Sequence, residues 1–401
     1  MKKSPLVGRL VVIVVAALAA AILGASFLSR KAPGYLRRSL EKALQKKVRI
    51  RDIQYDLPMR FELRGVEVLE EAPFQGEASF EAEEIRLRLS PVSLSRKALV
   101  IDALEVEGAT VSVRKLNGKL THPFSAAVAP AAEGKTTASA TAGPPAKIVA
   151  GPLPLEIHKL KIDKSLFKLI DYDVEAAGFV VAADRIRLEA ERIRLPSPPA
   201  TGASAGRRGP TRYRLEGLLL QGREERPARL VINGWTDFGL LDTDALLAAK
   251  GVRLPYFRPY YGLVTGAVIR EGTADLRAVF RIERKEFVGN IDVEIVGLLF
   301  DAYEEGDLLF GLKAGEILSF LKDSSGHLRL TADFRRDLAD RSVKPRELIR
   351  RSIAKSLKET LIGNIGRIVQ GAAHRIGEEN PEKEKNPVEE TVKKIKDFLK
   401  Y

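Results

Sequence analysis

The sequence predicts a mainly β protein with one N-terminal transmembrane helix, an elongated antiparallel β-sheet and a C-terminal amphipathic helix. Three observations predict this class: an uncharged apolar run at residues 10–28, apolar–polar alternation with a period of two within residues 48–343, and an apolar stripe with helical spacing at residues 344–370. Short strands joined by turns, with few helices between them, are typical of antiparallel sheets rather than of β-α-β units.

The apolar run is long enough to cross a membrane. A helix rises 1.5 Å per residue, so residues 10–28 span about 28 Å, close to the roughly 30 Å of a hydrocarbon core. Lys2, Lys3 and Arg9 would also suit a signal peptide, but a signal core has only about 7–15 apolar residues, so we favour an uncleaved anchor that follows a short segment at residues 1–9. The expected anchor residues are Leu10, Val11, Val12, Ile13, Val14, Val15, Leu18, Ile22, Leu23, Phe27 and Leu28.

Positive residues lie on both sides of this run and leave its orientation open. Arg30, Lys31, Arg37 and Arg38 follow it, and a strict count would keep the long C-terminal part in the cytoplasm. Long downstream domains cross membranes regardless of flanking charge, and the run resembles an export signal, so we expect the C-terminal part to be exported.

Composition narrows the class of partner. No cysteine occurs among the 401 residues, which excludes disulfides, thiolate nucleophiles and most structural zinc sites. The net charge of +13 suits anionic lipid head groups or nucleic acid. Aromatic residues make up only 6% of the chain and no module interleaves them with Arg or Lys, so we expect a lipid surface and no nucleic acid.

Residues 33–47 are expected to form an amphipathic helix next to the membrane. Tyr35, Leu36, Leu40 and Leu44 recur at helical spacing, with basic residues between them. The helix either lies on anionic head groups or packs as a stalk on the first strands, and the sequence favours neither reading.

The β region contains two interruptions and one clear hairpin. Residues 124–152 and 196–210 are rich in Ala, Pro, Thr, Ser and Gly, and we interpret them as flexible insertions between strands. Alternation on both sides of Arg284 and Lys285 predicts a hairpin within residues 275–295. A short helix is expected at residues 311–321, and another alternating strand at residues 328–334.

The C-terminal part is expected to hold two further helices. Pro345 opens the first, at residues 344–370, whose apolar stripe includes Ile349, Ile353, Leu357 and Leu361. Such a stripe most often docks on a sheet, with membrane or partner contact as the alternative. Residues 378–401 form a charged tail that ends in a short helix.

The sequence carries no pattern that predicts catalysis. It has no glycine-rich phosphate loop, no G-x-S-x-G elbow and no H-E-x-x-H helix. The four histidines do not stand at metal-ligand spacing, and the acidic pairs lie in solvated runs. We therefore predict a protein that is not an enzyme and needs no metal and no cofactor.

Several motifs resemble the AsmA-like family. The run Pro255 to Gly262, the Gly289-Asn290 step in the hairpin and the run Leu308 to Phe334 resemble the family's C-terminal repeat, at about residues 251–361. The membrane helix, the amphipathic helix and the Leu89-Ser90-Pro91 step resemble its amino-terminal domain.

This resemblance implies an open β-groove that is anchored in the inner membrane, single-pass, with the bulk of the chain in the periplasm. It also implies binding of phospholipid, a part in lipid transport or outer-membrane biogenesis, and envelope protein partners. The expected groove lining is Ile85, Leu87, Leu89, Leu276, Ala278, Phe280, Ile291, Val293, Ile295, Leu328 and Leu330. From the residues alone two alternatives stay open: the apolar face is the closed core of a sandwich, or the protein is a non-enzymatic scaffold that acts through protein contacts.

Overall fold

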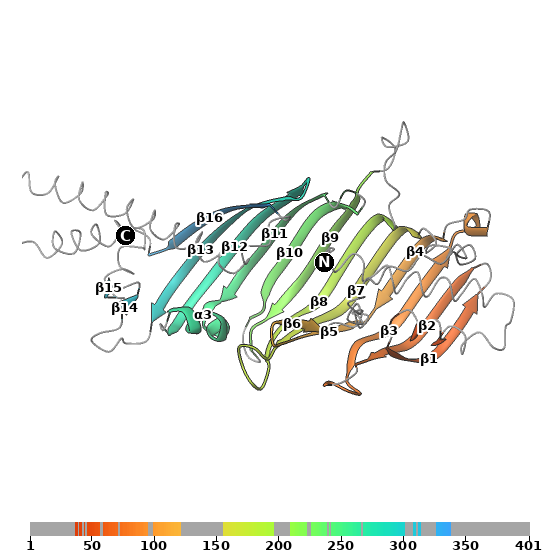
Figure 1. Cartoon of the computed structure of the whole chain (residues 1–401), viewed down its shortest axis with the longest axis horizontal. Helices are drawn as coiled ribbons and strands as arrows, with labels where there is room; N and C mark the ends of the chain where they lie inside the picture. Colours follow the sequence, from red (N-terminus) through yellow and green to blue (C-terminus); the bar gives the residue numbers. More distant parts are fainter. Residues whose placement is uncertain are drawn as a thin grey trace, which may run out of the picture. The chain divides into compact units, whose positions relative to one another are not determined.

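A computed structural model of the chain divides into two compact units. Figure 1 labels its helices and strands. The first unit comprises Met1–Leu218 and Asn233–Asp242, and the second Leu219–Ile232 and Thr243–Tyr401. Within these units the described residues are 37–38, 40–41, 44, 46–56, 59–70, 73–94, 99–121, 155–195, 209–222, 226–238, 240, 242–265, 268–300, 308–309, 312–313 and 326–337.

Several expected segments lie outside the described residues. These are residues 1–9, the anchor at 10–28, the insertion at 124–152, nearly all of the insertion at 196–210, the helix at 344–370 and the tail at 378–401. In the part of the chain that is described, no helix has the length and apolar character needed to cross a membrane.

The first unit is built from strands that mostly follow one another in the sheet. The strand order is β1-β2-β3-β4-β7-β8-β9, and β5 pairs with β3, β6 and β7. The 3-10 turn η1 (Pro91–Leu94) lies between β3 and β4. The bounds are β1 Lys47–Asp56, β2 Arg60–Leu69, β3 Ala78–Leu89, β4 Leu99–Glu107, β5 Thr110–Leu116, β6 Lys119–Thr121, β7 Leu155–Asp171, β8 Phe179–Leu195 and β9 Thr211–Leu220.

Two pairings correct the expectation of a wholly antiparallel sheet. Strands β4 and β5 both run parallel to β7, with Leu104 opposite Leu160 and Val113 opposite Leu169. Parallel neighbours need a crossover connection of about a dozen residues or more, and residues 122–154 supply it. The segment interpreted as an insertion is therefore also the crossover that makes these pairings possible.

Apolar residues of neighbouring strands stand opposite one another and form rows across the first unit. Because side chains on opposed positions share a face, such rows build a continuous apolar surface. One row crosses six strands through Ile53, Leu63, Ile85, Val106, Ile162 and Leu188.

A line of irregular residues crosses this sheet and keeps its apolar face on one side. Gly65 and Gly108 have φ of 60° and 64°, and Glu83 lies between them in the register. Across this line two successive core residues of a strand are three positions apart instead of two, as in a β-bulge. The pairs that show the longer spacing are Ile50 and Ile53, Leu63 and Val66, Ala82 and Ile85, and Val106 and Ala109.

The second unit is antiparallel, with order β11-β12-β13-β16 (Figure 1). The predicted hairpin is confirmed: β12 and β13 pair from Glu283–Glu286 back to Ile269–Phe300. The prediction of a short helix at residues 311–321 is wrong for Leu312–Lys313. These residues form strand β15, which pairs with β14 (Leu308–Leu309). The remaining bounds are β10 Ala228–Asp237, which both units share, β11 Asp242–Arg253, η3 Leu254–Phe257, α3 Arg258–Thr265, β12 Ile269–Glu283, β13 Glu286–Phe300 and β16 Leu328–Asp337.

Candidate functional site

The three lining residues predicted in the first unit lie in a packed core. Ile85, Leu87 and Leu89 are 1–3% exposed. They belong to one cluster with the helical residues Leu40 and Leu44, each 2% exposed. Side chains this deeply buried are already in contact with protein, so this part of the apolar face offers no accessible surface.

A buried ion pair holds the helical residues against the first strands. Lys46 Nζ donates to both carboxylate oxygens of Glu70, at 2.8 and 2.7 Å, and both side chains are almost fully buried. Loss of either partner would leave an uncompensated buried charge, which is strongly unfavourable. Of the two alternatives for the helix at residues 33–47, these contacts favour the one in which it packs on the first strands, because Leu40 and Leu44 share a core with strand residues.

The second unit presents a different apolar face. Leu276, Phe280, Ile291, Val293 and Leu330 are each only half-buried. The other predicted lining residues on these strands, Ala278, Ile295 and Leu328, are buried. The large side chains at the middle of this face therefore keep accessible apolar surface.

The register places these residues in continuous rows. Leu276 stands opposite Ala249 on one side and Val293 on the other, and Val293 stands opposite Leu330. The next row consists of Leu247, Ala278, Ile291 and Ala332. The predicted lining of β12, β13 and β16 is thus brought together on one face.

Phe334 belongs to the same face and was not among the predicted lining residues. Its ring lies over Gly289, where a Cβ atom would meet a ring carbon at 2.1 Å, and it stacks on Phe287 with centroids 5.5 Å apart. Gly289 therefore lets an aromatic ring lie flat against the strand. Phe334 continues the alternation of Leu328, Leu330 and Ala332, and that alternation was the available signal.

The opposite face of β12 and β13 is mostly polar and carries a few exposed valines. Val279 and Val288 are 38% and 42% exposed. Arg335 forms an ion pair with Glu286, and its hydrogen bonds hold the pKa of that carboxyl below its ordinary value. Charged pairs on one face and apolar rows on the other make this part of the sheet strongly amphipathic.

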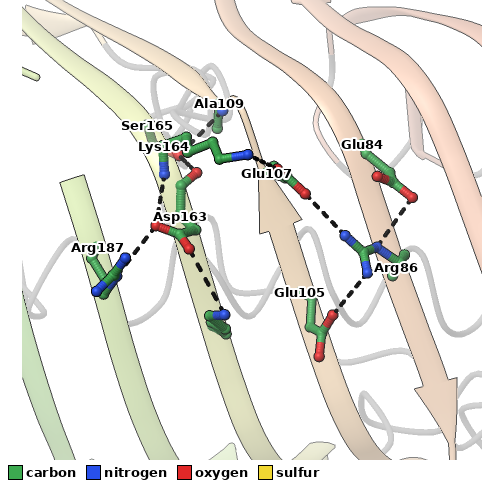
Figure 2. Close-up of polar contacts among 10 residues, drawn as sticks. Glu84, Arg86, Glu105, Glu107, Ala109, Asp163, Lys164, Ser165 and Arg187 are labelled. Atoms are coloured by element: carbon green, nitrogen blue, oxygen red, sulfur yellow. Dashed lines mark hydrogen bonds and ion pairs between the residues drawn. The ribbon is translucent and has the colours of Figure 1, made fainter. Parts of the chain in front are cut away.

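The outer face of the first unit carries an ion-pair network (Figure 2). Arg86 reaches Glu84, Glu105 and Glu107 at 2.9–3.4 Å, and Lys164 Nζ lies 2.6 Å from Glu107. The hydrogen bond from Lys164 is the main reason why the pKa of Glu107 is lowered. The network is solvent-exposed and links β3, β4 and β7, which is typical of a structural rather than a catalytic arrangement.

Among the described residues no group of three or more His, Asp or Glu side chains is arranged to hold a metal ion. His158 and His327 each lie beside carboxylates on the sheet, at 3.3 Å from Asp102 and 3.2 Å from Glu294. His122 and His374 lie outside the described residues.

Comparison with known proteins identifies the family. The family model described as AsmA family matches residues 1–246. This range covers more than half of the 401-residue chain and ends before the C-terminal repeat expected at about residues 251–361. No curated protein and no solved structure matches significantly. The AsmA family is associated with the cell envelope and is generally non-enzymatic. The chain belongs to the AsmA family.

Proposed function

We propose that this protein binds phospholipid acyl chains on the apolar face of β11, β12, β13 and β16, and that it assists lipid transport or outer-membrane biogenesis. In this proposal residues 10–28 anchor the chain in the inner membrane and the strands lie in the periplasm. The lining residues of the first unit, Ile85, Leu87 and Leu89, serve as core and not as binding surface.

One observation supports the proposal above all others. The rows through Leu276, Val293 and Leu330 are continuous across strands, yet their side chains stay half-buried. Apolar surface exposed over several strands is unusual for a soluble protein and marks an interaction site. The buried counterpart in the first unit shows what the same kind of face looks like when protein covers it.

The energetics favour an acyl chain as the occupant. Each methylene group that leaves water contributes about 0.8 kcal/mol, so a chain that buries ten methylenes gains roughly 8 kcal/mol before its ordering cost. The positive net charge of the chain, +13, would at the same time favour anionic phosphate head groups.

Mass spectrometry of the purified full-length protein tests the proposal. We expect phospholipid to co-purify with the wild type and to fall at least five-fold in the Phe280→Asp variant, because a carboxylate on the apolar face opposes acyl chains. Val279→Asp is the matched control: it is the next residue along β12, it lies on the opposite face and it should keep the lipid.

Circular dichroism and thermal unfolding of both variants show whether each sheet is intact. The absence of lipid from wild type and control alike would contradict lipid binding and favour the scaffold function, in which partner proteins contact this face. An equal loss of lipid in two folded variants would show that this face is not the binding surface.

A further inference from the structure

The apolar face of the second unit carries a charged residue at one end. Four successive rows cross this face, each with one residue from β11, β12, β13 and β16 in that order. The rows are Ala249, Leu276, Val293 and Leu330; Leu247, Ala278, Ile291 and Ala332; Ala245, Phe280, Gly289 and Phe334; and Thr243, Ile282, Phe287 and Arg336. Within these four rows of described residues, Arg336 alone is charged, and it belongs to the last row, next to the turn between β12 and β13.

The surroundings of Arg336 are those of a basic residue at the border of an apolar surface. It stands directly opposite Phe287, whose ring stacks on Phe334. The Arg336 side chain is half-buried, whereas Arg335 and Asp337 on either side of it are exposed. Long basic side chains bury their methylene stem on apolar surface and keep the charged end near water. Arg336 therefore puts a positive charge at this end of the face.

The other end of the face is filled by apolar side chains. Leu254 of η3 and Leu298 of β13 both reach Gly272 of β12, where an added Cβ would meet their Cδ1 atoms at 3.3 and 3.1 Å. Leu298 is buried, and so are Ala274 and Ile295, which stand opposite each other beside this point. The face thus has a direction along the strands, from a positive charge at the hairpin turn to apolar packing at η3.

The distance between the two ends suits one acyl chain. The face-lining positions of β13, from Phe287 to Ile295, extend about 27 Å along the strand. The acyl chains of one leaflet occupy half of a hydrocarbon core of roughly 30 Å. A chain that lies along the strands is therefore accommodated between Arg336 and η3.

From this direction we infer that Arg336 binds the phosphate of a phospholipid whose acyl chains run along the strands toward η3. The inference rests on the proposed function and adds the head-group site and the orientation of the bound lipid. A guanidinium carries five N–H donors in a planar fork, so it holds a phosphate and a protein acceptor at the same time. The opposite orientation would place the phosphate beside Leu254 and Leu298, where the loss of water around its charge is unfavourable.

Photocrosslinking of the full-length protein in detergent micelles tests the inference. Phosphatidylglycerol and diacylglycerol with identical acyl chains are compared, each with a diazirine at the methyl end of one chain. After irradiation, peptide mass spectrometry counts the adducts on residues 242–337, which span β11 to β16. For the wild type we expect at least three times more adducts with phosphatidylglycerol, concentrated on peptides that contain Leu254 or Leu298.

Three variants separate the charge of Arg336 from its other contributions. Arg336→Met removes the charge and keeps a long apolar stem, so phosphatidylglycerol adducts should fall at least three-fold while diacylglycerol adducts stay unchanged. Arg336→Lys keeps a positive charge and should retain at least half of the phosphatidylglycerol adducts. Arg335→Met is the matched control, because Arg335 is the preceding residue on the opposite, exposed face and should affect neither lipid. Circular dichroism shows whether each variant is folded.

The outcomes distinguish this inference from the proposed function. Unchanged phosphatidylglycerol adducts in folded Arg336→Met overturn the head-group site and leave the binding face standing. An equal fall for both lipids also overturns it, because residue 336 then supports the sheet and not the phosphate.

Two further results bear on the orientation and on the source of the phosphate. Chain-end adducts concentrated near Phe287 overturn the orientation. Loss of the adducts in a ten-fold excess of glycerol phosphate overturns a lipid as the source of the phosphate. If neither lipid labels these strands in the wild type, the proposed function fails and this inference fails with it.

Discussion

At the residue scale, opposite charges across neighbouring strands set the properties of the outer face. Glu107 on β4 accepts a hydrogen bond from Lys164 of β7 and also contacts Arg86 of β3. All three side chains are partly or largely exposed, so water screens their attraction. These ion pairs join three neighbouring strands and contribute little net stability.

The lowered pKa of Glu107 gives a prediction with a definite sign. A carboxyl whose pKa is lower in the folded state stabilises the fold above its unfolded pKa of about 4.5, and that stabilisation is lost as the pH falls through the folded value. We therefore expect Lys164→Met to be slightly less stable than the wild type at pH 7, and the difference to be smaller at pH 3. Urea unfolding at both pH values measures this difference, and a difference that does not change with pH would contradict the assignment.

At the scale of elements, the irregular line through Gly65, Glu83 and Gly108 sets the path of the first strands. The backbone of Gly108 has φ of 64°, and the Glu83 side chain occupies the space where a Cβ would lie, with Cδ at 2.4 Å. A larger residue at this position therefore meets backbone strain, whereas the exposed end of the Glu83 side chain can move aside at little cost.

We expect Gly108→Ala to lower the free energy of unfolding by about 1 kcal/mol, the backbone cost, because the end of the Glu83 side chain can move aside. Gly118→Ala is the comparison, because Gly118 also has a positive φ of 71° but no atom within 4 Å of an added Cβ. The two variants should lose about the same free energy. Urea unfolding measures both losses, and a clearly larger loss for Gly108→Ala would show that Glu83 is held in place.

At the scale of the whole molecule, the sequence predicted the class of secondary structure and the apolar face. Alternation sufficed for this, because side chains at positions such as Phe280 and Val293 must share one side of a strand. The family resemblance is confirmed, although the matched range is residues 1–246 and not the C-terminal repeat. The parallel pairing of β4 with β7 was missed, because strand order across a long connection has no local signal.

Besides strand order, the alternation of apolar and polar residues also fails to show which segment of the protein covers an apolar face of the sheet. Leu87 and Val293 have similar sequence surroundings, yet Leu87 is 1% exposed and Val293 is half-buried. The difference depends on which distant segment packs on each strand, as Leu40 does in the first unit. The predicted lining therefore divides into core residues on β3 and candidate binding residues on β12, β13 and β16.

Photocrosslinking of lipid in living cells tests the central claim most directly. A benzophenone amino acid replaces Phe280 on the apolar face or Val279 on the opposite face, and adducts are identified by mass spectrometry after irradiation. The account predicts phospholipid adducts at position 280 at least ten times more abundant than at position 279. Equal labelling at the two positions, or adducts of protein alone at position 280, would contradict it.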